Sequence, residues 1–352
     1  MIDRPISLGT MTLGAGRPPL IVAEMSANHR GSLDEALAIV RTAAEQGAGA
    51  IKLQTYTPAT LTLDSARPEF FIDDSSSVWH GRRLWELYEE AHTPWEWHEP
   101  LFNAARSCGL ACISSAFEQK SLEFLLGLGA DAIKISSFEL IHIPLLEAAA
   151  RSGKPLLVST GMASVAELDD AVTALRDNGC RRFVLLKCTS AYPAEEKHAN
   201  VLTMQAMSAR YDCAVGFSDH ALGPYASFAA VALGAVVVEK HLTMSRAAGG
   251  VDAAFSLEPG EFRELVEGTR RVWESRGEAR FGPHPSEGAS VRERPSIYVV
   301  HDVRKGERFT DRNVRIVRPG NGLAPKHFAA ILGRRAAYDI DGETPLASDM
   351  LA

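Results

Sequence analysis

The sequence has 352 residues, 46% of them hydrophobic and 23% charged, which is ordinary for a globular protein and long enough for one large and one small domain. Lys and Arg total 37 against 44 Asp and Glu; the formal charge of -7 argues against a nucleic-acid partner, so an anionic substrate would need a local basic site. Five cysteines without a C-x-x-C pair argue against a zinc site or a disulfide framework. The sequence has no signal-peptide pattern and no apolar run of about 20 residues. Together with the unpaired cysteines, this predicts a cytoplasmic protein without a membrane segment.

Eight short apolar runs alternate with amphipathic stretches from Leu20 to about Ser275. Their nearly continuous apolar character is typical of parallel strands that are buried on both faces. The runs cover residues 20–24, 50–54, 110–114, 131–135, 155–159, 182–187, 213–217 and 236–240. Eight β-α units predict an α/β protein with a (β/α)8 TIM barrel, and a doubly wound parallel sheet is the structural alternative.

Two of the intervening helices, expected over residues 32–47 and 164–179, carry clear end signals. Each begins with a Ser that has a Glu three residues later, which is the spacing of an N-terminal capping box. Each also ends at a Gly, the residue preferred just beyond a helix C-terminus.

The segment between the second and third runs, residues 67–99, is too long for a plain loop and is rich in aromatic residues. Long insertions of this kind often form a wall or a lid over a binding site. The simpler interpretation is a surface helix held down by Trp85, Trp95 and Trp97, and the two interpretations are compatible.

A separate small domain is expected at the C-terminal end of the chain. Residues 282–295 are rich in Pro, Gly and Ser and lack periodicity, which indicates a linker. Residues 296–352 show alternating runs and turn signals, and their core would be small. The expected organisation is a catalytic barrel over 1–281, a linker over 282–295 and a C-terminal domain over 296–352.

The carboxyl ends of barrel strands carry the chemistry in this fold, so polar residues there are candidates for the site. Lys52 and Gln54 would share one face of their strand, because side chains alternate. A lysine inside an apolar run is costly unless it meets a negative partner. Lys52 and Lys134, with hydroxyls at neighbouring strand ends, predict a phosphate and carboxylate site. Alternatively, each lysine reaches solvent or pairs with a structural glutamate.

His220 and His241 follow the seventh and eighth runs, so they would end adjacent strands. Two imidazoles from neighbouring strands, with carboxylates nearby, could bind a divalent metal ion and leave positions open for water and substrate. The alternative for each histidine is a core residue or a general acid–base group.

Several stretches together resemble the nonulosonic (sialic) acid synthase family, most closely its pseudaminic acid synthase branch. They are AEMSANHRGSLDEAL, AIKLQTYTPATLTLDS, TPWEWH, YPAEE, VGFSDHALG, VEKHLTMSR and GGVDAAFSLEP. The C-terminal RPGNGLAPK and its surroundings resemble the antifreeze-like (SAF) domain that this family carries. The likeness runs from about residue 20 to residue 350.

The resemblance implies a (β/α)8 barrel, a linker, a SAF domain and a domain-swapped homodimer. It implies a transferase of carbohydrate biosynthesis that condenses phosphoenolpyruvate with 2,4-diacetamido-2,4,6-trideoxy-altrose, giving pseudaminic acid and phosphate by C–O bond cleavage. An N-acetylneuraminate or legionaminic acid synthase is the alternative. The implied cofactor is a divalent metal ion, Mn²⁺ first, with Mg²⁺ or Co²⁺ as alternatives.

The resemblance also assigns site residues. It implies His220 and His241 as metal ligands, and Glu24, Asp252 and Tyr192 as catalytic or sugar-binding residues, with Glu24 moving the proton. Substrate-binding roles are implied for Lys52, Gln54, Ser115, Lys134, Ser137, Glu139, Ser159, Ser218 and Arg318. Ser115 lies in SSAF, where the family often has Thr in an STPF-like motif, so the hydroxyl is kept and the proline is lost.

Two other functions and one further role stay open at this point. A Schiff-base aldolase would use Lys134 or Lys187 as its amine. A carbohydrate-binding protein would bind sugar without releasing phosphate. Arg318 is expected to complete the sugar site of a partner subunit, because its planar fork of donors suits amide and hydroxyl oxygens; the alternative is an arginine that stabilises a turn.

Overall fold

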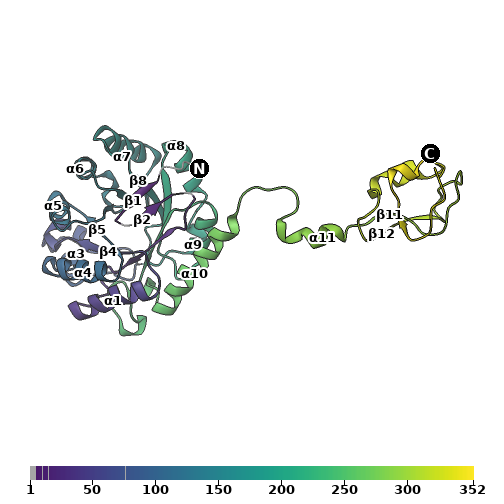
Figure 1. Cartoon of the computed structure of the whole chain (residues 1–352). Coiled ribbons are helices and arrows are strands. Elements are labelled where there is room, and N and C mark those ends of the chain that lie inside the picture. The colour runs from purple at the N-terminus through teal and green to yellow at the C-terminus, as the bar shows by residue number, and fades with distance from the viewer. Residues whose placement is uncertain (1–4, 10, 15, 76) are drawn as a thin grey trace. The chain divides into compact units, whose positions relative to one another are not determined.

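The computed structural model of the chain describes residues 5–9, 11–14, 16–75 and 77–352. The chain divides into two compact units, Met1–Gly277 and Glu278–Ala352 (Figure 1). The stretch in which the sequence predicted a linker contains a 3-10 turn at Pro285–Glu287 and the short helix α11 (Gly288–Arg292).

The first unit is built around a closed barrel of eight parallel strands, in which β10 pairs with β3 and closes the ring. The barrel strands are β3 (Leu20–Glu24), β4 (Ala50–Thr55), β5 (Ala111–Ala116), β6 (Ala132–Ile135), β7 (Leu156–Ser159), β8 (Phe183–Cys188), β9 (Ala214–Asp219) and β10 (Val237–His241). Every neighbouring pair is parallel, which confirms the predicted barrel and excludes the doubly wound sheet.

Helices follow the strands and surround the barrel (Figure 1). They are α1 (Leu33–Glu45), α2 (Pro58–Leu61), α3 (Leu84–Ala91), α4 (Trp95–Ser107), α5 (Gln119–Gly127), α6 (Ile143–Arg151), α7 (Val165–Asp177), α8 (Thr203–Tyr211), α9 (Tyr225–Ala232) and α10 (Pro259–Arg276). At α7 the predicted capping box is complete, since Ser164 and Glu167 bond reciprocally. At α1 only half of it forms, because the carboxylate of Glu35 pairs with Arg30.

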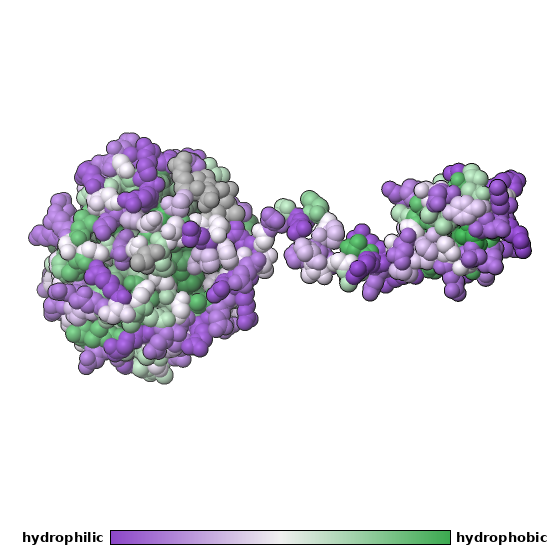
Figure 2. Space-filling model, in the orientation of Figure 1, coloured by the Kyte–Doolittle hydropathy of each residue, from purple (hydrophilic) through white to green (hydrophobic). Residues whose placement is uncertain are grey.

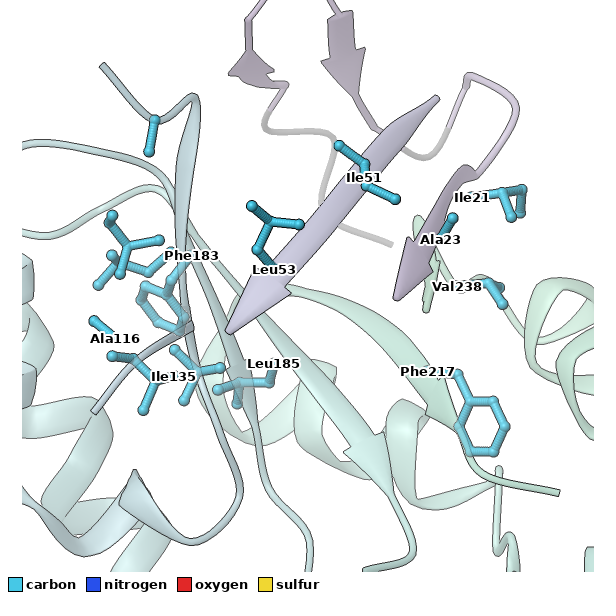
Figure 3. Packing of buried hydrophobic residues seen from close by; sticks show 14 of the residues in the cluster. Ile21, Ala23, Ile51, Leu53, Ala116, Ile135, Phe183, Leu185, Phe217 and Val238 are labelled. Carbon is cyan, nitrogen blue, oxygen red and sulfur yellow. The ribbon is translucent and has the colours of Figure 1, made fainter. Parts of the chain in front are cut away.

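Alternation along the strands divides the apolar residues between two cores. Ile51 and Leu53 pack with the helices in the larger core, which Figure 3 shows from close by. Ala50 belongs to a second cluster inside the barrel. Lys52 and Gln54 therefore share one face, as the sequence predicted, and the structure shows that this face points into the barrel. The small antiparallel hairpin β1 (Ile6–Leu8) and β2 (Met11–Leu13) adds its apolar side chains to the inner cluster.

The aromatic-rich insertion forms a packed helix layer and a loop that contacts the connection after β10. Trp95, at the start of α4, stacks on Phe124 with ring centroids 4.6 Å apart. Before α3, an isolated bridge joins Phe71 to Arg83 and closes a loop that contains Trp79. The indole N–H of Trp79 donates to the backbone carbonyl of Val251 at 2.8 Å. The insertion is thus tied to the connection that follows β10.

The second unit contains an antiparallel sheet in the order β12 (Val314–Val317), β11 (Ser296–Val299), β13 (Thr344–Pro345), with the short helix α12 (Phe328–Ile331). Its small core includes Ile297, Phe309 and Leu346. No helix in the described part of the chain has the length and apolarity needed to cross a membrane. On the face shown in Figure 2, hydrophobic residues are interspersed with hydrophilic ones on both units.

Candidate active site

Two lysines and two glutamates form a buried ionic cluster inside the barrel. The Nζ atom of Lys52 lies 2.6 Å from Oε2 of Glu24 and 3.6 Å from Oε1 of Glu239. The Nζ atom of Lys134 lies 3.7 Å from the same Oε1 of Glu239. None of these side chains is more than 5% exposed. The structure thus brings the two predicted lysines to one carboxylate, and it adds Glu239, to which the sequence assigned no role.

Burial and mutual attraction set the protonation of this cluster. Burial raises the pKa of Glu24 to about 7, although Lys52 acts to lower it. Burial also acts to raise the pKa of Glu239, but that pKa is lowered, chiefly by Lys134 and Lys52, with help from the hydrogen bond of Ser218. Burial lowers the pKa of Lys134. Glu24 is therefore the member of the cluster best placed to exchange a proton near neutral pH.

Two of the predicted serines bond directly to the ionic cluster. Ser115, on β5, lies with its Oγ 3.4 Å from the amine of Lys52. The hydroxyl of Ser218, on β9, donates to Oε1 of Glu239 at 2.9 Å. The departure from the family motif at Ser115 has kept a hydroxyl beside the lysine.

The other two predicted serines lie around the end of β7. The hydroxyls of Ser137 and Ser190 are 2.8 Å apart. Gly161 has φ of 45°, and a Cβ there would lie 2.4 Å from the Cβ of Ser137. The buried hydroxyl of Ser159 has no hydrogen-bond partner among the described residues. Ser159 is thus free to bond to a ligand, and Gly161 permits the close packing against Ser137 and Ser190.

A chain of hydrogen bonds connects Glu24 to Asp252. Nε2 of Gln54 donates to Oε1 of Glu24 at 2.8 Å and to Oγ of Ser26 at 2.9 Å. The hydroxyl of Ser26 donates in turn to Asp252, which also accepts from the backbone N–H of Ala27. Burial raises the pKa of Asp252, while the bond from Ser26 opposes that shift. Three predicted residues are thereby joined through Ser26, which the sequence did not assign.

His220 and His241 lie side by side at the ends of β9 and β10, with ring centroids 5.6 Å apart. Nδ1 of His220 is 2.9 Å from the carbonyl oxygen of Thr189, so donation from Nδ1 would leave Nε2 as a free acceptor. Nδ1 of His241 is buried and has no partner within the described part of the chain. Burial lowers the pKa of His220 to about 4 and that of His241 well below the usual range, so both rings are neutral at pH 7.

A second buried ion pair lies on the opposite face of the strands that carry the histidines. Nζ of Lys240, on β10, is 2.9 Å from Oδ2 of Asp219, on β9, and both side chains are at most 2% exposed. The same amine donates to the carbonyl oxygens of Ala221 and Gly223 in the loop after β9. Lys240 therefore contacts the side chain of the residue before the first histidine and the backbone of the loop after it.

Aromatic rings line the approach to the histidines. Tyr192 lies 4.5 Å from the ring of His220 and 5.3 Å from that of Phe255, centroid to centroid. Phe255 is also 5.0 Å from His241. Trp79 continues this set, 5.6 Å from Tyr192 and 5.9 Å from Phe255. The sequence predicted Tyr192 as a site residue but gave no role to Trp79.

The remaining two predicted residues lie outside the ionic cluster. Glu139 begins the 3-10 turn Glu139–Ile141 after β6, accepts a hydrogen bond from Ser136, and has a pKa that burial raises and Lys134 acts to lower. Arg318 is an exposed residue of the second unit, directly after β12.

A closed (β/α)8 barrel whose strand ends gather lysines, carboxylates and paired imidazoles is the layout of an enzyme. Residues 39–281 match the NeuB family and residues 294–352 match the SAF domain. The chain belongs to the NeuB family, as the sequence motifs predicted.

Similar proteins extend this result over nearly the whole chain. A pseudaminic acid synthase of Helicobacter pylori is 38% identical, covering 95% of this chain and 98% of its own. One from Campylobacter jejuni is 39% identical, covering 91% and 93%. An N,N'-diacetyllegionaminic acid synthase of Legionella pneumophila is 33% identical, covering 96% of each chain. The solved structure of an N-acetylneuraminic acid synthetase from Leptospira borgpetersenii has a TM-score of 0.73 at 31% identity, covering 82% and 95%.

Proposed function

We propose that this protein is a pseudaminic acid synthase, which condenses phosphoenolpyruvate with 2,4-diacetamido-2,4,6-trideoxy-altrose and releases phosphate. The observation that carries the proposal is the 38–39% identity to proteins of that name over 91–95% of the chain, against 33% to legionaminic acid synthases. The five cysteines are free, which suits a reaction in the reducing cytoplasm.

Phosphoenolpyruvate would bind over the two buried lysines. Lys52 and Lys134 supply positive charge for its phosphate and carboxylate, and the serine hydroxyls supply donors. These hydroxyls belong to Ser115, Ser137, Ser159 and Ser218. Because Glu239 lies within 3.7 Å of both amines, its carboxylate favours their charged forms and holds them in place when the substrate is absent.

In the reaction, the methylene carbon of phosphoenolpyruvate attacks the aldehyde carbon of the open-chain sugar. Water then adds to the adjacent enol carbon, and the tetrahedral intermediate loses phosphate by C–O cleavage. Glu24, whose pKa burial raises to about 7, takes the proton of that water or returns one to the sugar alkoxide. Asp252 and Tyr192 hold hydroxyl or amide groups of the sugar. Gln54 keeps Glu24 and Asp252 in one hydrogen-bonded chain.

We further propose that His220 and His241 hold a divalent metal ion, Mn²⁺ first. Both imidazoles are neutral, and the unpartnered Nδ1 of His241 is a free ligand atom. No group of three or more potential ligand side chains occurs among the described residues, so water and substrate would complete the coordination. Such an ion supplies a Lewis acid for the aldehyde oxygen. His241→Ala should lose bound metal in elemental analysis; wild-type metal content would contradict the assignment.

A homodimer is also part of the proposal. Large apolar side chains are 57–67% exposed in the connections that follow β6, β7, β8 and β9 or at the first residue of the next helix. They belong to Phe138, Ile141, Met162, Val165, Leu202 and Tyr225. Burying such a surface against a second subunit would stabilise a dimer. We propose that Arg318 of the SAF domain then completes the sugar site of the partner subunit.

The test of this function is phosphate release from phosphoenolpyruvate with three sugars in parallel: the diacetamido-trideoxy-altrose, the legionaminic precursor and N-acetylmannosamine. The first should give the highest kcat/KM. A Schiff-base aldolase is the second candidate, because burial lowers the pKa of Lys134 as an amine nucleophile requires. Borohydride would trap a lysine adduct in that enzyme, whereas the synthase should remain active and unmodified.

A further inference from the structure

Trp79 joins the long insertion to two other connections at the mouth of the barrel. Its ring lies 5.6 Å from Tyr192, in the connection after β8, and 5.9 Å from Phe255, in the connection after β10. Its N–H donates to the carbonyl oxygen of Val251, next to the proposed sugar-binding residue Asp252. Trp79 is only partly buried, so part of the indole remains accessible. It therefore lies beside the proposed sugar site, and part of its surface is available for contact with a ligand.

The surface of these rings differs in kind from that of the hydrogen-bonded chain that ends at Asp252. The single hydrogen-bond donor of Trp79 is already used by Val251, and Phe255 has no polar side-chain atom. The hydrogen-bonded chain of Ser26, Gln54 and Asp252 reaches the same connection, since Asp252 lies between Val251 and Phe255 in the sequence. A sugar held by Asp252 and Tyr192 would therefore meet both hydrogen-bonding groups and aromatic carbon.

We propose that Trp79 determines sugar specificity, by packing its indole against a methyl-bearing substituent of the sugar. The inference rests on the proposed function. The diacetamido-trideoxy sugar carries a methyl group at C6 and an acetamido group at C4, where N-acetylmannosamine carries hydroxyls. A hydroxyl group placed against the indole ring would lose its hydrogen bonds to water without gaining a partner. A methyl group would instead gain van der Waals contact with the ring.

The test compares Trp79→Ala and Trp79→Phe with the wild-type enzyme on the trideoxy sugar and on N-acetylmannosamine. Trp79→Ala should raise KM for the trideoxy sugar about tenfold or more, as expected for lost apolar contacts, and leave KM for phosphoenolpyruvate unchanged. Preference between the sugars should fall by a similar factor, and Trp79→Phe should retain most of it. The matched control is Trp95→Ala, which removes an indole of the same insertion that stacks on Phe124.

Two results would overturn the inference. If the wild type prefers the trideoxy sugar and Trp79→Ala keeps that preference, the tryptophan only fastens the insertion, and its variant should then resemble Trp95→Ala in thermal stability and kinetics. If the wild type itself releases phosphate only with N-acetylmannosamine, the proposed sugar is wrong and the role of Trp79 falls with it. A loss of preference confined to the Trp79 variants supports the inference.

Discussion

At the scale of single residues, the site depends on opposite charges that are buried together. Lys52 lowers the pKa of Glu24, which burial has raised to about 7. Lys52→Met removes this partner, so the pKa of Glu24 should rise further. An acid whose pKa is higher in the folded than in the unfolded state destabilises the fold as pH rises through these values. The variant should therefore lose more stability at pH 8 than at pH 6.

Urea unfolding of Lys52→Met and the wild type at the two pH values measures this effect. At pH 8, one unit above the wild-type pKa of about 7, the extra loss should approach about 1.4 kcal/mol. The control is the double variant Lys52→Met/Glu24→Gln, in which the added pH dependence should disappear. A loss of stability that is the same at both pH values would mean that Glu24 does not depend on Lys52.

At the scale of elements, side-chain alternation explains why three consecutive residues of β10 have different roles. Val238 packs in the larger core, between the barrel and the helices, and Lys240 lies on the same face of the strand. Glu239 and His241 face the barrel interior. Lys240→Met should destabilise the fold by about 3–5 kcal/mol, because Asp219 would be left as an unpaired buried charge. It should also weaken metal binding, although both histidines remain.

Chemical unfolding and metal titration of Lys240→Met check this expectation, with Lys240→Met/Asp219→Asn as the matched control. The double variant should recover part of the stability, since no unpaired charge remains. Unchanged stability and metal affinity in Lys240→Met would show that the buried pair has no part in holding the loop after β9.

Local pattern was enough to predict the strands, the shared face of Lys52 and Gln54 and the histidine pair, because each depends only on alternation and on the order of strands. It was not enough for Glu239, whose partners Lys52 and Lys134 lie on β4 and β6. Nor did it single out Trp79, because the contact with Tyr192 depends on the path of a long insertion. The complete capping box predicted for α1 does not form either, because the carboxylate of Glu35 pairs with Arg30.

At the scale of the whole molecule, the central prediction concerns Arg318. If it acts on the sugar site of a partner subunit, Arg318→Ala and His241→Ala chains should each be nearly inactive alone. In a mixed dimer, the barrel of the Arg318→Ala chain would receive an intact arginine from its partner, so one of the two sites should work. Co-refolding the two variants and measuring phosphate release tests this. Mixed dimers that form but stay inactive would rule out supply from the partner.

The most direct test of the proposed reaction is to follow the bridging oxygen of phosphoenolpyruvate into the products. The proposed site adds water to the enol carbon and breaks the C–O bond, so phosphoenolpyruvate labelled with ¹⁸O at this oxygen should pass the label to phosphate. With the diacetamido-trideoxy sugar, mass spectrometry should find labelled phosphate and unlabelled pseudaminic acid in equal amounts. Label retained in the sugar acid, with cleavage at phosphorus, would contradict the account.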